Sequence, residues 1–73
     1  MKTIGVIVAM NKEMAKLKTI INVTETFEIY NNTFFCGEYN NTKIVLAISG
    51  IGKVNAAMTT MLMIANFNPS LII

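Results

Sequence analysis

The 73-residue sequence lacks several residue types on which sites and small folds often depend. It has no histidine, and its single cysteine, Cys36, cannot form a disulfide within the chain. No residues of the metal-ligating types have the spacing of a metal site. We therefore expect no metal, no cofactor and no histidine-activated nucleophile, and we expect Cys36 to be a core residue.

Charged residues are also few. Lysine and glutamate supply all of them, and the formal net charge is only +2. Nucleic-acid binding needs basic residues gathered on one face, and the nearest approach to a cluster is Lys12, Lys16 and Lys18. Their spacing favours the solvated face of a helix, so no nucleic-acid partner is expected.

Long apolar runs are missing. No stretch reaches the roughly 18 apolar residues that a membrane-spanning helix needs. The apolar run that follows Lys2 ends at residues 11–13 and lacks the cleavage site of a signal peptide. We therefore predict a cytoplasmic protein without a membrane partner.

The chain is nevertheless very apolar for its size, with 53% hydrophobic residues. A domain this small buries only about 60% of its unfolded surface, so stability without disulfides or metals is marginal. Its last three residues, 71–73, are apolar and are followed by neither a turn nor a polar tail. We expect residues 1–73 to be the N-terminal part of a single larger domain, truncated inside a strand.

The first quarter of the chain predicts a strand followed by a helix. Residues 4–9 are almost continuously apolar, as in a strand buried on both faces. A helix is expected over residues 11–21, with Asn11 as its N-cap and Glu13 in the first turn. Its apolar face consists of Met10, Met14, Leu17 and Ile21.

The middle of the chain predicts a β-meander. Three strand-like runs cover residues 25–30, 33–39 and 43–48. The asparagine pairs at 31–32 and 40–41 separate them, and asparagine tolerates the conformations of two-residue hairpin turns. The third run is continuously apolar and is therefore expected to be central.

A second helix is predicted over residues 53–66, and a further strand begins at residue 71. The expected apolar face of this helix consists of Val54, Ala57, Met58, Met61, Leu62 and Ala65. The fold class is therefore α/β, with a mixed central sheet that includes the meander and with two helices.

The loop at residues 49–53, Ser-Gly-Ile-Gly-Lys, lies between a buried strand and a helix, where α/β proteins place ligands. It is not a Walker A loop, because Ala47 and Val54 occupy the required Gly and Ser/Thr positions. It is not a dinucleotide fingerprint either, because Asn55 replaces the third glycine. The loop is either a tight turn alone or a ligand-binding segment that includes Ser49 and Gly50.

Glu13 is the only acidic residue predicted at a strand-to-helix junction. Its carboxylate is either a general base or a group that merely stabilises the helix dipole. Residue types and spacing leave both readings open.

Two segments together carry a family resemblance. The string Ala-Met-Asn-Lys-Glu at residues 9–13 and the string Gly-Ile-Gly-Lys-Val-Asn-Ala-Ala at residues 50–57 resemble the opening of the 5′-methylthioadenosine/S-adenosylhomocysteine nucleosidases. These enzymes belong to the purine nucleoside phosphorylase superfamily. The resemblance extends through residues 68–73 and covers about the first third of a family member. It implies the front part of a phosphorylase/hydrolase-like fold.

The resemblance also implies an activity, hydrolysis of the N-glycosidic bond to release adenine and the thioribose. It implies that Glu13 holds the attacking water and accepts its proton, and that Met10 and Ile51 line the ribose and alkylthio pocket. Ser49 and Gly50 are expected to bind substrate in the same loop. The family acid that protonates adenine is an aspartate later in the sequence, and this chain has no aspartate. The chain alone is therefore expected to be inactive and to need the C-terminal portion and a homodimer partner.

Two alternatives remain at this point. The protein could act on another purine nucleoside, including futalosine-like ones, or use phosphate instead of water. It could also be a binding module that retains the front of the fold without the chemistry.

Overall fold

A computed structural model of the chain describes residues 2–49 and 53–73. The elements, in chain order, are β1 (Thr3–Val8), α1 (Asn11–Ile20), β2 (Asn22–Ile29), β3 (Asn32–Tyr39), β4 (Thr42–Ile48), α2 (Lys53–Phe67) and β5 (Leu71–Ile72). The predicted α/β class, the meander and both helices are confirmed. The main difference in extent is β2, which begins three residues before the predicted run.

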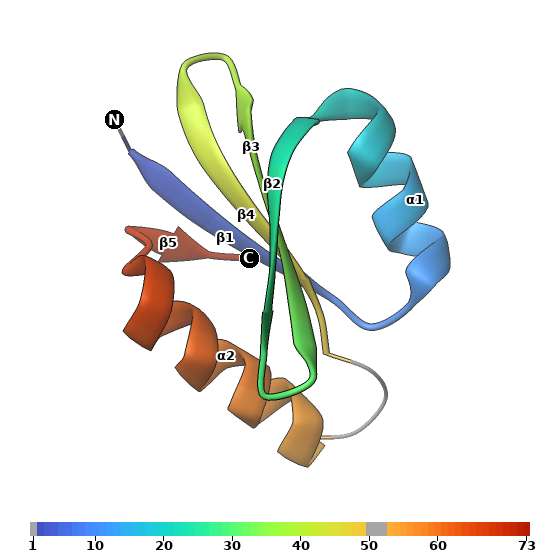
Figure 1. The fold of residues 1–73 in the computed structure, drawn as a ribbon, viewed down its shortest axis with the longest axis vertical. Helices are drawn as coiled ribbons and strands as arrows, with labels where there is room; N and C mark the ends of the chain where they lie inside the picture. The colour runs from blue at the N-terminus through green and yellow to red at the C-terminus, as the bar shows by residue number, and fades with distance from the viewer. Residues whose placement is uncertain (1, 50–52) are drawn as a thin grey trace.

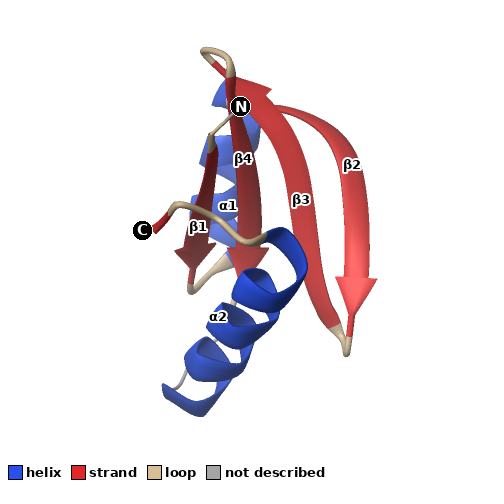
Figure 2. Cartoon of the chain, turned by 90° about the vertical axis from the view of Figure 1, so that its left-hand side faces the viewer, coloured by secondary structure: helices blue, strands red, loops and turns tan. Residues whose placement is uncertain are grey.

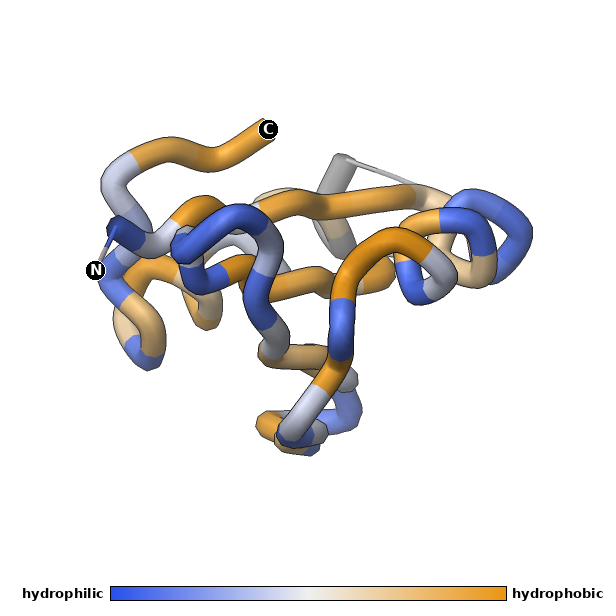
Figure 3. The backbone as a smooth tube through the Cα atoms, turned by 90° about the horizontal axis from the view of Figure 1, so that it is seen from above, coloured by the Kyte–Doolittle hydropathy of each residue, from blue (hydrophilic) through white to orange (hydrophobic). Residues whose placement is uncertain are grey.

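The strands form one mixed sheet in the order β2-β3-β4-β1-β5 (Figure 1). The meander strands β2, β3 and β4 pair antiparallel, whereas β1 pairs parallel with both β4 and β5. β4 is therefore internal, as its continuous apolar run predicts. The hydrophobic stretch that ends at the C-terminus in Figure 3 contains β5.

The two helices cover opposite faces of the sheet, with α2 in front and α1 behind in Figure 2. Successive residues of β4 alternate between the two cores. Val45 and Ala47 pack with Met63 of α2, whereas Ile44 and Leu46 pack with Met14 of α1. A strand buried on both faces has no polar alternation, which explains the apolar run.

The start of α1 differs from the prediction. Met10, and not Asn11, is the N-cap; its backbone is extended, with φ −133° and ψ 150°, and no side chain caps the helix. Asn11 is the first helical residue. The predicted apolar face is confirmed by buried Met14 and Ile21, but Met10 is 52% exposed and does not belong to it. The cause is that the backbone at Met10 is still extended after β1, and the helix begins only at the next residue.

The predicted apolar face of α2 is right at Leu62, which is partly buried, and wrong at Ala57, Met58, Met61 and Ala65, which are exposed; the side chain of Val54 lies outside the described residues. The residues that face the sheet are Thr59 and Met63, with Leu62 and Phe67 partly buried. Met58 and Met61, which were expected in the core, are 50% and 71% exposed. Residues 54–67 contain no charged residue, so the pattern does not specify which side of this helix is buried.

The first hairpin turn is shifted by one residue from its predicted place. It consists of Tyr30 and Asn31, with φ 47° and 64°, while Asn32 pairs with Ile29 as part of β3. Positive φ at both central residues is the requirement of a type I′ turn. The side-chain amide of Asn32 donates a hydrogen bond to the Tyr30 carbonyl oxygen at 3.0 Å. The second turn, at residues 40–41, is as predicted.

Gly37 allows a close approach between β3 and the start of β2. A Cβ at this position would lie 2.8 Å from the carbonyl carbon of Asn22 and would also clash with its oxygen, both of which are backbone atoms. A Cβ at Gly5 would instead meet the sulfur of Met63, a side chain that can move. We expect Gly37→Ala to lower the free energy of unfolding by about 1–3 kcal/mol, and Gly5→Ala by less.

Urea denaturation of both variants measures this difference. The two variants are a matched pair, because each replaces a glycine within a strand by alanine. If Gly5→Ala lowers the free energy of unfolding as much as Gly37→Ala does, the close approach of β2 to β3 is not what makes alanine unfavourable at position 37.

Candidate functional site

The candidate site lies where β1 and β4 end side by side. The two strands are parallel neighbours, and Val8 is the register partner of Ile48. The backbone N–H of Ser49 donates to the Val8 carbonyl oxygen at 2.9 Å. The segments that follow the two strands therefore start at the same edge of the sheet, which is the edge where open α/β sheets bind ligands.

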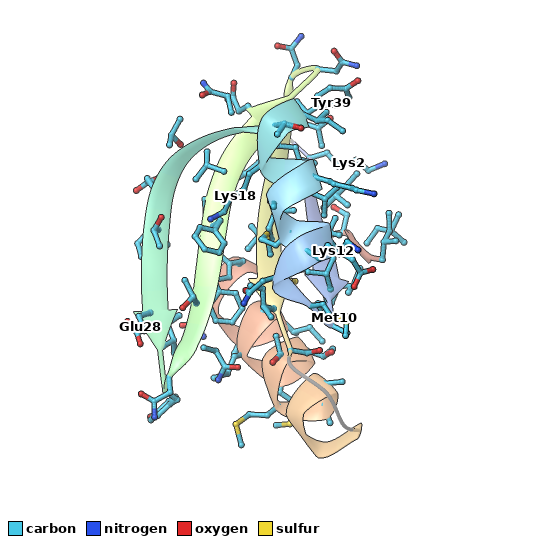
Figure 4. The ribbon with its side chains drawn as sticks, turned by 90° about the vertical axis from the view of Figure 1, so that its right-hand side faces the viewer. Lys2, Met10, Lys12, Lys18, Glu28 and Tyr39 are labelled. Carbon is cyan, nitrogen blue, oxygen red and sulfur yellow. The ribbon has the colours of Figure 1, made fainter. Side chains whose placement is uncertain are left out.

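Met10 and Glu13 come from the β1 side of this edge. Met10 is the N-cap of α1, and its side chain lies at the start of that helix in Figure 4. Glu13 is an exposed residue in the first turn of α1. A carboxylate there is stabilised by the positive end of the helix dipole and remains accessible to water or a ligand.

Ser49, Gly50 and Ile51 come from the β4 side. Ser49 is partly buried at the end of β4. Gly50 and Ile51 lie outside the described residues. The structure thus brings the Met10–Glu13 segment and Ser49 to one edge.

A pocket of about 480 Å³ adjoins Ser49. Its lining comprises residues 30–33, Ile48, Ser49 and Met58. The turn residues belong to this edge because β3 runs antiparallel to β4, so that β3 begins where β4 ends. Sequence reasoning placed a turn near residue 31 but missed its contribution to a pocket. The available signal was the antiparallel meander, which returns that turn to the carboxyl end of β4.

One hydrogen-bonded pair joins this turn to α2. Thr59 is fully buried, and it is the only buried polar residue in the described part of the chain. Its hydroxyl donates to the side-chain oxygen of Asn32 at 3.0 Å, and the Asn32 amide in turn donates to the Tyr30 carbonyl at 3.0 Å. The sequence did not predict this pair, because the expected buried face of the helix included Met58 and left its neighbour Thr59 on another side.

Another pocket, of about 500 Å³, lies far from this edge. It is lined by the C-terminal half of α1 and by the start of β2, where the Lys18 ammonium sits 3.6 Å from the centroid of the Phe35 ring. α1 begins at the candidate edge and ends at this pocket. The two hollows therefore belong to opposite ends of the sheet.

Cys36 is buried in the core between the sheet and α2, as expected. Burial raises the pKa of its thiol, and the nearby Lys43 only partly offsets that effect. The thiolate is therefore disfavoured at neutral pH, which is unfavourable for a nucleophile.

Within residues 2–49 and 53–73, no three residues of the histidine, cysteine and carboxylate types gather as a metal site would require. In the same residues, neither helix is long and apolar enough to cross a membrane.

The fold defines an α/β protein whose candidate ligand site lies at the carboxyl ends of two adjacent parallel strands. Its family follows from the sequence model of the Phosphorylase superfamily, which matches residues 3–73. The chain belongs to this superfamily, and the predicted family resemblance is confirmed.

Relatives make the resemblance more specific. The chain is 45% identical over 71 residues to the 5′-methylthioadenosine/S-adenosylhomocysteine nucleosidase of Oceanobacillus iheyensis, covering 97% of this chain and 31% of that protein. It is 44% identical over 70 residues to the nucleosidase of the same name from Psychromonas ingrahamii, covering 96% of this chain and 30% of the relative. The chain therefore spans about a third of the length of the curated relatives it matches.

Solved structures agree with the fold. The nucleosidase from Neisseria meningitidis in complex with methylthio-immucillin-A superposes with a TM-score of 0.92 at 35% identity, over 99% of this chain and 31% of that one. A futalosine hydrolase mutant from Helicobacter pylori superposes with a TM-score of 0.90 at 32% identity, over 99% of this chain and 33% of that one.

Proposed function

We propose that residues 1–73 form the N-terminal part of a single domain that hydrolyses the N-glycosidic bond of 5′-methylthioadenosine and S-adenosylhomocysteine. The observation that carries the proposal is the pairing of β1 with β4, because it brings the Glu13 segment and Ser49 to one sheet edge. Relatives at about 45% identity that are named as nucleosidases for these two compounds support it.

In the proposed reaction, Glu13 acts as the general base. Its carboxylate accepts a hydrogen bond from a water and takes the proton as the water oxygen bonds to the anomeric carbon. The bond from that carbon to the adenine nitrogen breaks, and adenine leaves after gaining a proton. We propose that the acid that gives this proton is an aspartate in the rest of the protein, as the family resemblance implies, because residues 1–73 contain no aspartate.

Binding of the substrate is assigned to the same edge. Met10 and Ile51 are proposed to contact the ribose and the alkylthio group, and Ser49 and Gly50 to bind substrate through the loop after β4. The exposed, apolar Met10 side chain suits a thioether, which has no strong hydrogen-bonding group. We further propose a cytoplasmic homodimer that acts in methionine salvage, without a metal or other cofactor and without nucleic-acid or membrane partners.

Release of adenine from 5′-methylthioadenosine by the full-length protein tests this function. We expect the full-length protein to release adenine without phosphate, with free thioribose as the second product, and residues 1–73 alone to release none. Dependence on phosphate and a phosphorylated sugar product would instead identify a phosphorylase. Absence of adenine under both conditions would contradict the proposal.

A second candidate substrate is futalosine, because a futalosine hydrolase has the same fold over 99% of this chain at 32% identity. The same assay with futalosine decides between the two. Release of free base from futalosine at a much higher kcat/KM than from 5′-methylthioadenosine would favour this candidate.

A further inference from the structure

One side of α2 is apolar and yet does not contact the sheet. Its residues are Ala57, Met58, Met61, Ile64 and Ala65, all of which are exposed. Met61 is 71% exposed, and Met58 and Ile64 are 50% and 52% exposed. Their spacing of three and four residues places them on one side of the helix, which we call the outer face of α2. Apolar side chains gathered in this way indicate a surface that another molecule covers.

The outer face explains why the sequence misplaced the buried side of this helix. Four of its five residues, all but Ile64, belong to the apolar face that the sequence predicts. The structure instead places Thr59 and Met63 against the sheet. A helix that is apolar on opposite sides is typical of one that is buried on both. The sheet covers one side of α2, and the outer face needs a second partner.

The rest of the domain is poorly placed to cover the outer face. The curated relatives are longer, since the chain covers 31% of one of them. In an α/β domain a single layer of helices covers each face of the sheet, so further strands join the sheet at its edges and further helices lie beside α2. Figure 2 shows α2 as the outer layer on its side of the sheet. Its outer face therefore remains on the surface of the complete domain.

The lack of charge on the outer face suits a second copy of the same protein. In a homodimer with two-fold symmetry the same surface of each copy faces itself, so any charge near the axis meets a like charge. α2 has no charged residue after Lys53. The centres of protein interfaces are depleted of charged residues and enriched in methionine, and this face has two methionines. The outer face thus has the composition of an interface centre and no group that would repel its own copy.

We propose that the outer face of α2 binds the same face of a second copy across a two-fold axis, with Met61 next to the axis. The inference rests on the homodimer that is part of the proposed function, and it assigns the surface. Met61 lies in the middle of the outer face. Ala57 and Ala65, about one turn before and after it, are small and let the two helices approach closely. Met61 of one copy therefore lies opposite Met61 of the partner subunit.

The test replaces Met61 by a charge of either sign in the full-length protein. Met61→Lys and Met61→Glu each bring two like charges together at the axis, so we expect each to raise the dissociation constant of the dimer at least about 100-fold. Mixing the two variants in equal amounts should restore a dimer, because a positive charge then faces a negative one. Analytical ultracentrifugation of the two variants and of their mixture measures this.

Ile20→Lys is the matched control. Ile20 is an apolar residue of α1 that is 59% exposed, and α1 lies on the other face of the sheet (Figure 2). The same introduced charge there should leave the dissociation constant unchanged. Both positions are exposed within one copy, so we expect the variants to keep the fold, which circular dichroism checks. If a charged Met61 variant does not fold, Met61→Ala keeps a good helix former and should still raise the constant about tenfold.

The outcomes separate this inference from the nucleosidase function. A dimer that persists in both charged Met61 variants, a mixture that stays monomeric, or an equal loss in Ile20→Lys contradicts the inference, and release of adenine by the unchanged protein would leave the function standing. An unchanged protein that is a monomer contradicts the inference together with the proposed homodimer. If the variants separate and their mixture pairs, but the unchanged protein releases no adenine, the surface is right and the nucleosidase function is wrong.

Discussion

Glu13→Gln is expected to reduce kcat for 5′-methylthioadenosine by about 10²- to 10⁴-fold in the full-length protein, as for removal of a general base. Glutamine has nearly the same size and can still hydrogen-bond a water, but it cannot take the proton. Substrate binding should therefore persist, with a dissociation constant within about threefold of the original by calorimetry, because the lost interaction matters in the transition state.

Glu38→Gln is the matched control for this variant. Glu38 is also an exposed carboxylate, but it lies at the opposite end of the sheet, where its backbone register partners are Asn22 in β2 and Lys43 in β4. The same chemical change there should leave kcat unchanged. Near-normal turnover in Glu13→Gln would exclude Glu13 as the base and would leave it the simpler role of stabilising the dipole of α1.

Phe34→Ala is expected to lower the free energy of unfolding by about 3–5 kcal/mol, as for other buried aromatic side chains replaced by alanine. Phe34 is fully buried in the core between the sheet and α2, and its ring centroid lies 5.3 Å from that of Phe67. Its removal leaves a cavity between β3, β4 and the helix. Because native stabilities are commonly about 5–15 kcal/mol, this single change removes a large share.

Phe27→Ala supplies the matched comparison. Phe27 contacts the same Phe67 ring, with centroids 5.9 Å apart, but it is 41% exposed on the edge strand β2. We expect Phe27→Ala to lower the free energy of unfolding by about 1 kcal/mol, which is the average loss measured for point substitutions. Urea denaturation of both variants measures the difference, and equal losses would mean that burial on this face does not govern stability.

Under the proposed function, residues 1–73 supply one half of a catalytic arrangement. Glu13, in the first turn of α1, is the proposed carboxylate on the water side of the reaction, and the sequence contains no aspartate or histidine to protonate the purine. Hydrolysis of an N-glycosidic bond needs both functions, because charge develops on the sugar and on the departing base together. The proposal that the chain works as part of a longer protein follows from this chemistry as well as from the length of its relatives.

The amino-acid sequence by itself determined the elements, the antiparallel directions of the meander strands and the family. The continuous apolar runs of β1 and β4 indicated strands buried on both faces, and the asparagine pairs indicated tight turns between antiparallel strands. These are local signals, because strand periodicity and turn conformation depend on neighbouring residues. The Ala-Met-x-x-Glu and Gly-Ile-Gly-Lys strings indicated the family in the same way.

Tertiary structure alone decided which side of α2 is buried and which residues surround the pocket. This helix has no charged residue after Lys53, so only its position on β1 and β4 selects Thr59 and Met63 for the interior. The same contact sets Thr59 beside Asn32, which is 27 residues away along the chain. No local pattern carries that information, because such a pairing depends on how the sheet turns the meander back toward the helix.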